Sequence, residues 1–408
     1  DAGDRGDWVP SAEDSNPRGA FHDCGVGDSS WHGTMVSGII GAASNNGIGM
    51  AGIASGVRIL PVRVLGKCGG FTDDIVAGMY WAAGKAVPGV PNNPNPARVL
   101  NLSLGGDGAC PKIYRDAVNE LTAPPYNAVI VVAAGNSAGL AVGNPANCAG
   151  VVAVAGLRHA GSKVGFSDLG PEITVAAPGG NCVNTAPGTP CLYPILASSN
   201  TGKKGPVAGG STWTDSYNIS VGTSFSTPIV AGISALMLSA RPTLGAAELI
   251  DLLKRSARPF PTSGAGTNAD GTPVLACRAP DGVTEQSQCY CSTAVCGAGM
   301  VDAAAAVQSV IQGVPLSVGA EQLLDYAEQQ FSGYFPEHVQ TQDAPPFRYR
   351  HYPTTGATVG VVISSDSQYV LNGVYVTGGP FGPALTPVGL VGQYITPSAA
   401  AQSAGRAP

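Results

Sequence analysis

The sequence predicts an α/β protein with a doubly wound, mostly parallel sheet, followed by a small C-terminal α+β module. Over the first 300 residues, short apolar runs rich in β-formers alternate with segments of helical periodicity, which is typical of βαβ units. The runs are almost entirely apolar, as expected of strands covered on both faces. The five expected strands are Val57–Val64, Arg98–Leu104, Ala128–Ala134, Val151–Ala155 and Ile173–Ala176.

Two helices are expected to begin at or just before residues whose side chains carry chemistry. Apolar side chains recur at helical spacing directly after His32, and they do so again after Ser224. Further helices are expected over Thr72–Ala86, Gly245–Arg258 and Val301–Ile311.

The regular alternation ends near Ile311, which predicts a domain boundary. We expect one large domain over residues 1–312, a linker over 313–319, a small module over 320–395 and a disordered Ala/Ser/Pro tail over 396–408. The small module is expected to contain one helix, Ala320–Phe331, and aromatic-rich strand segments at Phe347–Tyr352 and Tyr369–Val376.

The overall charge argues against some classes of function. Charged residues make up only 12% of the chain, the formal net charge is -6, and Lys and Arg form no cluster, so nucleic-acid binding is not expected. No apolar run approaches the ~20 residues that span a bilayer, so we expect no membrane span. The chain starts at Asp1 without a Met or a signal core, which indicates processing or an incomplete sequence, a fragment.

The cysteines predict disulfide bonds. There are ten of them, an even number, scattered through Gly/Asn/Pro-rich stretches rather than grouped as zinc ligands. This favours an oxidising compartment, although ten free thiols remain the alternative. The expected pairs join neighbours along the chain: Cys24 with Cys68, Cys110 with Cys148, Cys182 with Cys191, Cys277 with Cys289, and Cys291 with Cys296.

Ser224 lies where Gly222 and Thr223 lead into a long apolar helix. The free N–H groups and the dipole of a helix N-terminus stabilise negative charge that develops beside them. Pro228 is tolerated because it follows so closely on the helix start. The simpler interpretation is that Ser224 only caps the helix.

His32 also lies at the start of a helix, followed by Gly33, which permits close approach of a ligand or backbone. Because the pKa of histidine is near 6.5, a His beside a serine accepts its proton and returns it to a leaving amine at neutral pH. A lone His is more often structural. His22 is the nearest rival among the five histidines, but no element fixes it.

Asn136 follows the expected strand over Ala128–Ala134, so it lies at the carboxyl edge of the sheet, where α/β proteins bind ligands. Its amide is a suitable donor to an oxyanion. The alternative is an Asn that stabilises its own turn.

Three sequence runs together resemble the subtilisin-like serine peptidases, and in particular their secreted Gram-negative branch. They are WHGTMVSG (31–38), AAGNS (133–137) and GTSFSTP (222–228), and NLSLG (101–105), AAPG (176–179) and GAGMVDA (297–303) add to the resemblance. The resemblance covers roughly residues 6 to 311, so residues 1–312 are expected to form a peptidase domain. The run around Ser224 lacks the Gly-x-Ser-x-Gly pattern of α/β-hydrolases.

The resemblance implies a secreted serine endopeptidase acting through an acyl-enzyme, with Ser224 as nucleophile, His32 as general base and Asn136 as oxyanion donor. It further implies that Ser103, Leu104, Gly105 and Gly135 line the primary specificity pocket, with Gly143 near its base. The small residues predict a roomy, uncharged pocket. Protein or peptide substrates, a monomer and no required cofactor are expected.

The acid of the triad is not found ahead of His32. Family members carry it at the end of an apolar strand, and no such strand precedes His32 here. Asp1 is a poor candidate because nothing ahead of it forms a strand, so we expect the acid upstream of this chain. The resemblance also makes structural calcium possible, with Asp1, Asp4 and Asp7 as candidate ligands, but a solvated acidic loop is the favoured explanation of these residues.

Two other functional classes remain open. The fold is compatible with a catalytically dead binding protein, although such a protein has no reason to keep His32, Asn136 and Ser224 together. The C-terminal module is compatible with adhesion to a surface or polysaccharide through an aromatic face, although small domains also need aromatic residues for their core. The aromatic residues concerned are Phe331, Tyr334, Phe335, Phe347, Tyr349 and Tyr352.

Overall fold

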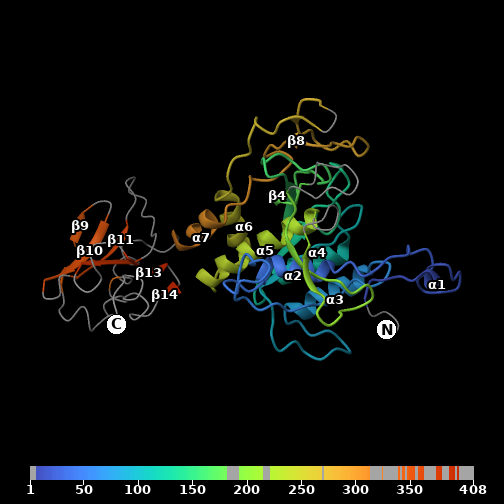
Figure 1. The fold of residues 1–408 in the computed structure, drawn as a ribbon, viewed down its shortest axis with the longest axis horizontal. Coiled ribbons are helices and arrows are strands. Elements are labelled where there is room, and N and C mark those ends of the chain that lie inside the picture. Colours follow the sequence, from blue (N-terminus) through green and yellow to red (C-terminus); the bar gives the residue numbers. More distant parts are fainter. Residues whose placement is uncertain are drawn as a thin grey trace. The chain divides into compact units, whose positions relative to one another are not determined.

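The computed structural model describes residues 6–181, 193–214, 221–268, 271–312, Leu324, 339–340, 342–344, 347–353, 357–362, 374–378, 386–390 and 393–394. The chain divides into two compact units: residues 1–236 with 243–303, and residues 237–242 with 304–408. The expected boundary lay at 312. Each unit is described by itself (Figure 1).

A parallel sheet forms the centre of the first unit (Figure 1). Its four strands follow the chain order, β1 (Val99–Leu102), β2 (Val129–Ala133), β3 (Val152–Leu157) and β4 (Ile173–Pro178), with all neighbours parallel. Each coincides with an expected strand to within a few residues. The α/β fold class predicted from the sequence is therefore confirmed.

Both faces of this sheet are buried, which explains why its strands are apolar throughout. In β2 every residue is buried, and Ile130 and Val132 pack in one core cluster with α3 (Thr72–Ala82) and α4 (Lys112–Thr122). Because side chains alternate along a strand, the equally buried Val129 and Val131 point to the opposite face. Polar side chains on either face would be desolvated, so the sequence supplies none.

The expected strand Val57–Val64 is wrong. The structure assigns no strand there, although Leu60, Val62 and Val64 pack against the core cluster. The apolar alternation in this segment therefore serves side-chain packing. A strand also needs a neighbouring strand to pair with, and within the described part of the chain no strand pairs with this segment.

The predicted helices of this unit are present, with shifted ends. They are α2 (His32–Gly41), α3, α5 (Thr223–Ala240) and α6 (Ala246–Arg255). This unit also contains a short helix, α1 (Ser11–Asp14), and two small two-stranded pairs. Strand β5 (Ala197–Asn200) pairs antiparallel with β6 (Ser211–Thr214), and β7 (Leu275–Ala276) pairs in parallel with β8 (Cys289–Tyr290). Helix α4 was not expected, although Tyr114, Val118 and Leu121 give it an amphipathic spacing.

Among the described residues, helix α5 is long and apolar enough to cross a membrane. However, 67% of it is buried inside the protein. The core helix of a folded domain passes the same test of length and composition.

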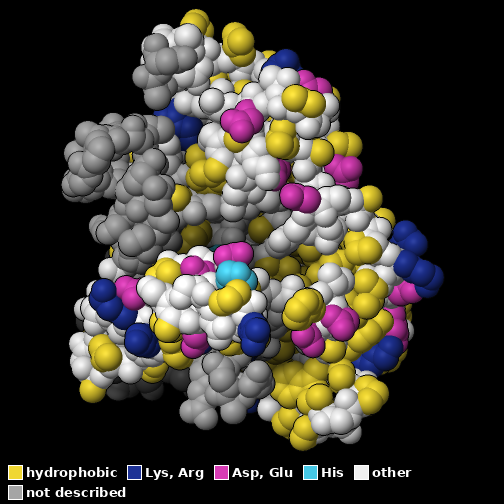
Figure 2. Space-filling model, turned by 90° about the vertical axis from the view of Figure 1, so that its right-hand side faces the viewer, with side chains coloured by type: hydrophobic (Ala, Val, Ile, Leu, Met, Phe, Trp, Pro, Cys, Tyr) yellow, Lys and Arg dark blue, Asp and Glu magenta, His cyan; other side chains and the backbone are white. Residues whose placement is uncertain are grey.

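Figure 2 shows Lys and Arg side chains in small separate groups on the visible face, without a continuous basic band.

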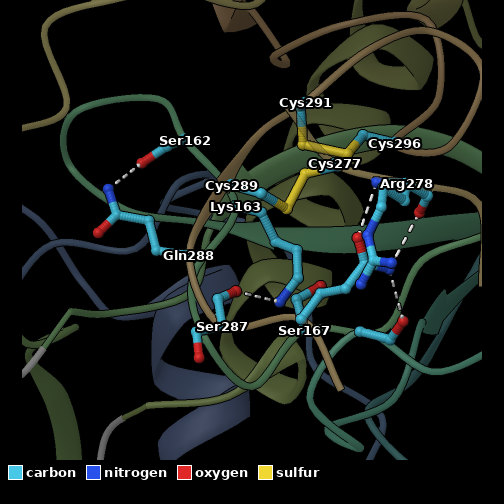
Figure 3. Close-up of a disulfide and its surroundings, with 12 residues drawn as sticks. Ser162, Lys163, Ser167, Cys277, Arg278, Ser287, Gln288, Cys289, Cys291 and Cys296 are labelled. Atoms are coloured by element: carbon cyan, nitrogen blue, oxygen red, sulfur yellow. Dashed lines mark hydrogen bonds between the residues drawn. A yellow bond between two sulfur atoms is a disulfide. The ribbon is translucent and has the colours of Figure 1, made fainter. Parts of the chain in front are cut away.

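Four of the five expected disulfides are present. Their Cα–Cα distances are 4.9 Å for Cys24–Cys68, 5.1 Å for Cys110–Cys148, 4.9 Å for Cys277–Cys289 and 5.7 Å for Cys291–Cys296. Cys182 and Cys191 lie outside the described residues. Sulfurs of the last two bridges gather closely, but each is already bonded to another sulfur, so they form no metal site (Figure 3).

The second unit contains α7 (Ala303–Gln312) and an antiparallel sheet. Its strand order is β14-β13-β12-β11-β10-β9, with ranges β9 (Gln342–Ala344), β10 (Phe347–Tyr352), β11 (Ala357–Val362), β12 (Val374–Gly378), β13 (Thr386–Leu390) and β14 (Gln393–Tyr394). Strand β10 has the expected bounds, and β12 overlaps the second expected segment. The expected helix Ala320–Phe331 lies outside the described residues, apart from helical Leu324.

Candidate active site

Ser224 is the second residue of α5 and lies where this helix meets the carboxyl end of β1. Its hydroxyl donates to the carbonyl of Ser103 at 3.3 Å, and the hydroxyl of Ser103 donates back to the carbonyl of Ser224 at 2.7 Å. The reciprocal bonds tie the first turn of α5 to the residue that follows β1. Ser224 is half-buried, while Phe225 and Ser226 beyond it are fully buried, so the chain presents this one hydroxyl at the surface of a fixed helix end.

Helix α2 carries His32 to the same place. Its Met35 and Ile39 form a small core cluster with Ala197 of β5 and Phe225 of α5. The ring of His32 meets the ring of Phe225 edge-on, with 6.0 Å between centroids. Packing between α2 and α5 therefore places His32 beside the residue that follows Ser224.

Asn136 approaches the same helix end from β2. Its side-chain oxygen accepts hydrogen bonds from the N–H of Thr223 at 2.9 Å and from the hydroxyl of Thr223 at 3.0 Å. Because two donors hold the oxygen, the orientation of the amide is fixed and its NH₂ group is free to face the site.

Gly222 shows where the two possible oxyanion donors converge. A Cβ built on it would lie 3.6 Å from the amide nitrogen of Asn136 and 3.7 Å from the backbone nitrogen of Ser224. Its φ of +147° also disfavours any other residue. Two N–H donors that flank one small space form the arrangement that stabilises a tetrahedral oxyanion.

An Asp-rich loop supports the start of α2. The carboxylate of Asp7 accepts from the hydroxyl of Ser29 at 2.9 Å and from both the hydroxyl and the N–H of Ser30, the latter at 3.0 Å. The hydroxyl of Ser30 in turn accepts from the N–H of His32 at 3.2 Å. Asp7 therefore holds the residue whose hydroxyl accepts from the first N–H group of the helix that begins at His32.

The burial of His32 favours a neutral imidazole. Burial lowers the pKa of His32, and the negative charge of Asp7 partly offsets this by raising it. Burial would also raise the pKa of Asp7, but the hydrogen bonds from Ser30 and Ser29 outweigh it and lower the pKa of that carboxyl. A neutral imidazole beside an ionised carboxylate is suited to accept a proton near pH 7.

Within the described residues, no carboxylate hydrogen-bonds to the ring of His32. Asp7 influences it only through space, because its oxygens are held by Ser29 and Ser30. Asp23 lies 3.4 Å from His22 instead. Asp1 and Asp4 lie outside the described residues, and the position of the triad acid stays a prediction.

A cavity of about 170 Å³ opens beside Ser224. Four of the expected residues line it, Leu104, Gly105, Gly135 and Gly143, together with Asn136 and Ser224. Ser103 does not line it and instead bonds to the backbone of Ser224. A larger hollow of about 470 Å³ beside α6 is lined by neither His32 nor Ser224 and so lies away from this chemistry.

The expectation of an uncharged cavity is wrong, because Asp107 and Asp168 also line it. Asp107 follows the glycines after β1, and Asp168 comes from the segment between β3 and β4, which the sequence presents only as a connection. Thr223 was also missed as the residue that orients Asn136, although its place directly before Ser224 marks it for this contact.

Comparison with known proteins identifies the type of domain. The family model of the subtilases matches residues 7–286. An "Extracellular protease" from Xanthomonas campestris pv. campestris is 40% identical over 318 residues, covering 76% of this chain and 45% of that protein. An "Extracellular basic protease" from Dichelobacter nodosus is 40% identical over 237 residues, covering 57% of this chain and 36% of that protein.

A solved structure of a protease from Pseudoalteromonas arctica is similar to the chain with a TM-score of 0.59. It shares 36% sequence identity, and the match covers 75% of this chain and 76% of that one. The chain spans less than half the length of the two curated relatives named above.

Proposed function

The chain belongs to the subtilase family, and from this premise we propose that it is a secreted serine endopeptidase that hydrolyses peptide bonds through an acyl-enzyme. The observation that carries the proposal is the convergence around Gly222 of two N–H donors, from Asn136 and Ser224, beside a helix that presents His32. A binding protein has no need of two N–H donors gathered beside a serine and a histidine.

The chemistry assigns one step to each group. The hydroxyl of Ser224 turns from the carbonyl of Ser103 toward His32, loses its proton to the imidazole and attacks the peptide carbonyl. The Asn136 amide and the Ser224 N–H donate to the oxyanion. His32 then protonates the leaving amine, and water releases the acyl group by the same steps in reverse order.

The proposal assigns the acid of the triad to a carboxylate ahead of Asp1, which would hold the imidazole in the correct tautomer. Asp7 is assigned a supporting part, since it positions Ser30 at the start of α2. The gene sequence that precedes Asp1 tests this directly. An apolar strand ending in Asp supports the assignment, and its absence from the full-length gene contradicts it.

The four described disulfides support secretion, because such bonds persist in oxidising compartments. The names of the two extracellular relatives support it as well. We propose protein or peptide substrates, a monomer and no required cofactor. Calcium at the Asp-rich loop is not supported by Asp7, whose oxygens already accept hydrogen bonds from Ser29 and Ser30.

A fluorophosphonate probe tests the assignment of the nucleophile. In the full-length protein we expect labelling of Ser224, and we expect Ser224→Ala to abolish both labelling and peptide hydrolysis, with a loss of about 10⁶ in kcat. Ser226→Ala is the matched control, because Ser226 lies in the same helix, fully buried, and should leave labelling intact. Labelling that survives Ser224→Ala overturns the assignment, and a wild-type protein that neither reacts nor hydrolyses peptides favours the binding-protein alternative.

A further inference from the structure

The cavity beside Ser224 has the size of a single side chain. Its volume of about 170 Å³ is below the roughly 300–1,000 Å³ typical of sites for whole small molecules. It lies against the two oxyanion donors, so a substrate whose carbonyl oxygen reaches them places the side chain of that same residue in the cavity. The lining of this cavity therefore decides which residue precedes the cleaved bond.

Asp168 is a carboxylate built into the wall of this cavity. Only 3% of the residue is exposed. One side-chain oxygen accepts from the N–H of Ser137 at 2.7 Å, and the other lies against Gly135, where a Cβ would collide with it. Gly135 also has a φ of +116°, so this wall requires glycine for two separate reasons. The missing side chain lets the carboxylate approach the cavity.

The charge of Lys163 acts on Asp168, but within the described part of the chain no ion pair joins the two residues. Lys163 is fully buried, and its ammonium donates to the carbonyls of Val164 at 2.9 Å, Gly165 at 2.9 Å and Ser287 at 2.8 Å. Figure 3 shows the Lys163 side chain directed toward Ser287, beneath the Cys277–Cys289 bridge. The positive charge is thus held by backbone dipoles rather than by the carboxylate.

Burial shifts both groups toward their neutral forms. It raises the pKa of Asp168 to about 6, a shift that hydrogen bonds from Ser137 and Gly139 and the charge of Lys163 partly oppose. It lowers the pKa of Lys163 to about 7, partly opposed by Asp168. Above pH 7 the carboxylate is therefore ionised while its neighbouring lysine loses its charge. A negative charge then remains at a desolvated wall, and a cationic guest compensates for it.

Asp107 adds a second negative charge at the mouth of the same cavity. It is exposed, and its backbone carbonyl accepts from the side chain of Asn144, another lining residue. A long side chain with a terminal cation would pass Asp107 and bring its charge to Asp168, while its methylenes contact Leu104 and Ala133.

We propose that Asp168, assisted by Asp107, makes this cavity select substrates that carry Lys or Arg immediately before the cleaved bond. The proposal rests on the proposed peptidase function and names its substrate class. It assigns to Asp168 a role in specificity in addition to its structural bond with Ser137.

The test compares peptides that differ only at this position, carrying Lys, Arg, Met or Gln, with the full-length protein at pH 8. We expect kcat/KM for Lys and Arg to exceed that for Met and Gln by about 10-fold or more, the effect of one desolvated charge pair. Asp168→Asn keeps an oxygen for the N–H of Ser137 but removes the charge. It should reduce the Lys/Met ratio to about one.

Two controls separate the cavity from general electrostatics. Asp107→Asn should lower the ratio by a smaller factor, because Asp107 is exposed. Asp116→Asn, on the exposed side of α4 and paired with Lys112, changes net charge equally and should leave the ratio unchanged. An unchanged ratio in Asp168→Asn, or an effect of equal size in Asp116→Asn, overturns the proposal.

A measurement on the unaltered protein guards against a variant that fails to fold. The Lys/Met ratio should fall as pH drops through about 6, where Asp168 takes up a proton, and should rise again toward pH 8 as Lys163 loses its proton. The ratio cancels the titration of His32, which affects both peptides equally. A flat ratio overturns the proposal. If the Met peptide is cleaved without any preference for Lys, only this inference fails, whereas an absence of all cleavage and of Ser224 labelling contradicts the peptidase function itself.

Discussion

The two sides of the site are held in different ways. On the nucleophile side, hydrogen bonds between residues far apart in sequence join Ser224 to Ser103 and Thr223 to Asn136, where a buried helix meets a buried sheet. On the base side, the first N–H group of α2 bonds to Ser30, which Asp7 holds in turn, and both residues belong to a loop with many exposed residues.

Because of this difference, the proposed oxyanion donors and the proposed base, His32, depend on different parts of the protein for their positions. The oxyanion donors depend on the core of the domain, so conditions that leave the core intact should leave them in place. The position and the pKa of His32 depend in addition on a loop outside the core. Perturbing each side should therefore change different kinetic quantities.

Removal of two disulfides of similar span gives the largest expected effect. Cys24–Cys68 closes 44 positions on the base side, and Cys110–Cys148 closes 38 positions next to the specificity cavity. Each removal is expected to lower the free energy of unfolding by about 4 kcal/mol through loop entropy. Cys24→Ser with Cys68→Ser should chiefly lower kcat, while Cys110→Ser with Cys148→Ser should chiefly raise KM. Thermal melts and steady-state kinetics test this, and identical kinetic defects in both variants would remove the distinction between the two sides.

Asn136→Ala should give the next largest effect on the nucleophile side. Loss of one oxyanion donor is expected to reduce kcat by about 10²–10³ with little change in KM, because the amide acts on the transition state. Thr223→Val is the companion variant: it removes one of the two donors that orient Asn136 while the Thr223 N–H remains, so its loss should be smaller. A change confined to KM in Asn136→Ala would mean that the residue binds the ground state instead.

Asp7→Asn should have the smallest effect, on the base side. Asp7 raises the pKa of His32, so removal of its charge should lower that pKa further. His32 acts as a base when neutral, so the acid limb of the kcat/KM profile should move to lower pH, while the oxyanion donors are unaffected. Asp28→Asn on the same loop serves as the control, because Asp28 is exposed and pairs with Lys203. A shift toward higher pH in Asp7→Asn would contradict the electrostatic part of the comparison.

The Asp7 carboxylate also stabilises the folded protein, and this contribution is lost in strong acid. Its pKa is lowered in the folded protein, so its contribution is present above its ordinary value of 3.8 and is lost as pH falls through the folded pKa. Below that point the bonds from Ser29 and Ser30 lose their ionised acceptor, so the base side should loosen first.

Local signals predicted the elements that build the site. The apolar runs gave β1 to β4, and the helix starts at His32 and Ser224 were placed within a residue of α2 and α5. These patterns succeed because a strand covered on both faces and a core helix leave few choices of side chain. The segment Val57–Val64 was misjudged because the same pattern serves packing without a strand partner.

The character of the cavity was not predictable in the same way. Asp168 lies 31 positions after Ser137 in sequence, and only the folded chain brings its carboxylate to that N–H. A lone Asp between two strands resembles a solvated turn residue. The burial that gives Asp168 and Lys163 their shifted pKa values arises from contacts with residues as distant as Ser287, which no local pattern records.

Two hydrogen bonds from Gln286 tie the loop after Asn136 to a much later part of the chain. The N–H of Gln286 donates to the carbonyl of Ala138 at 2.6 Å, and its side chain donates to the carbonyl of Gly139, 147 positions earlier in the chain. Gln286 lies in the sequence between Cys277 and Cys289, which form a disulfide with each other. The loop after Asn136 therefore takes part of its support from a segment that is synthesised much later and is itself closed by a disulfide. A chain that ends before Gln286, or one in which the Cys277–Cys289 bridge is reduced, is expected to hold this loop less firmly.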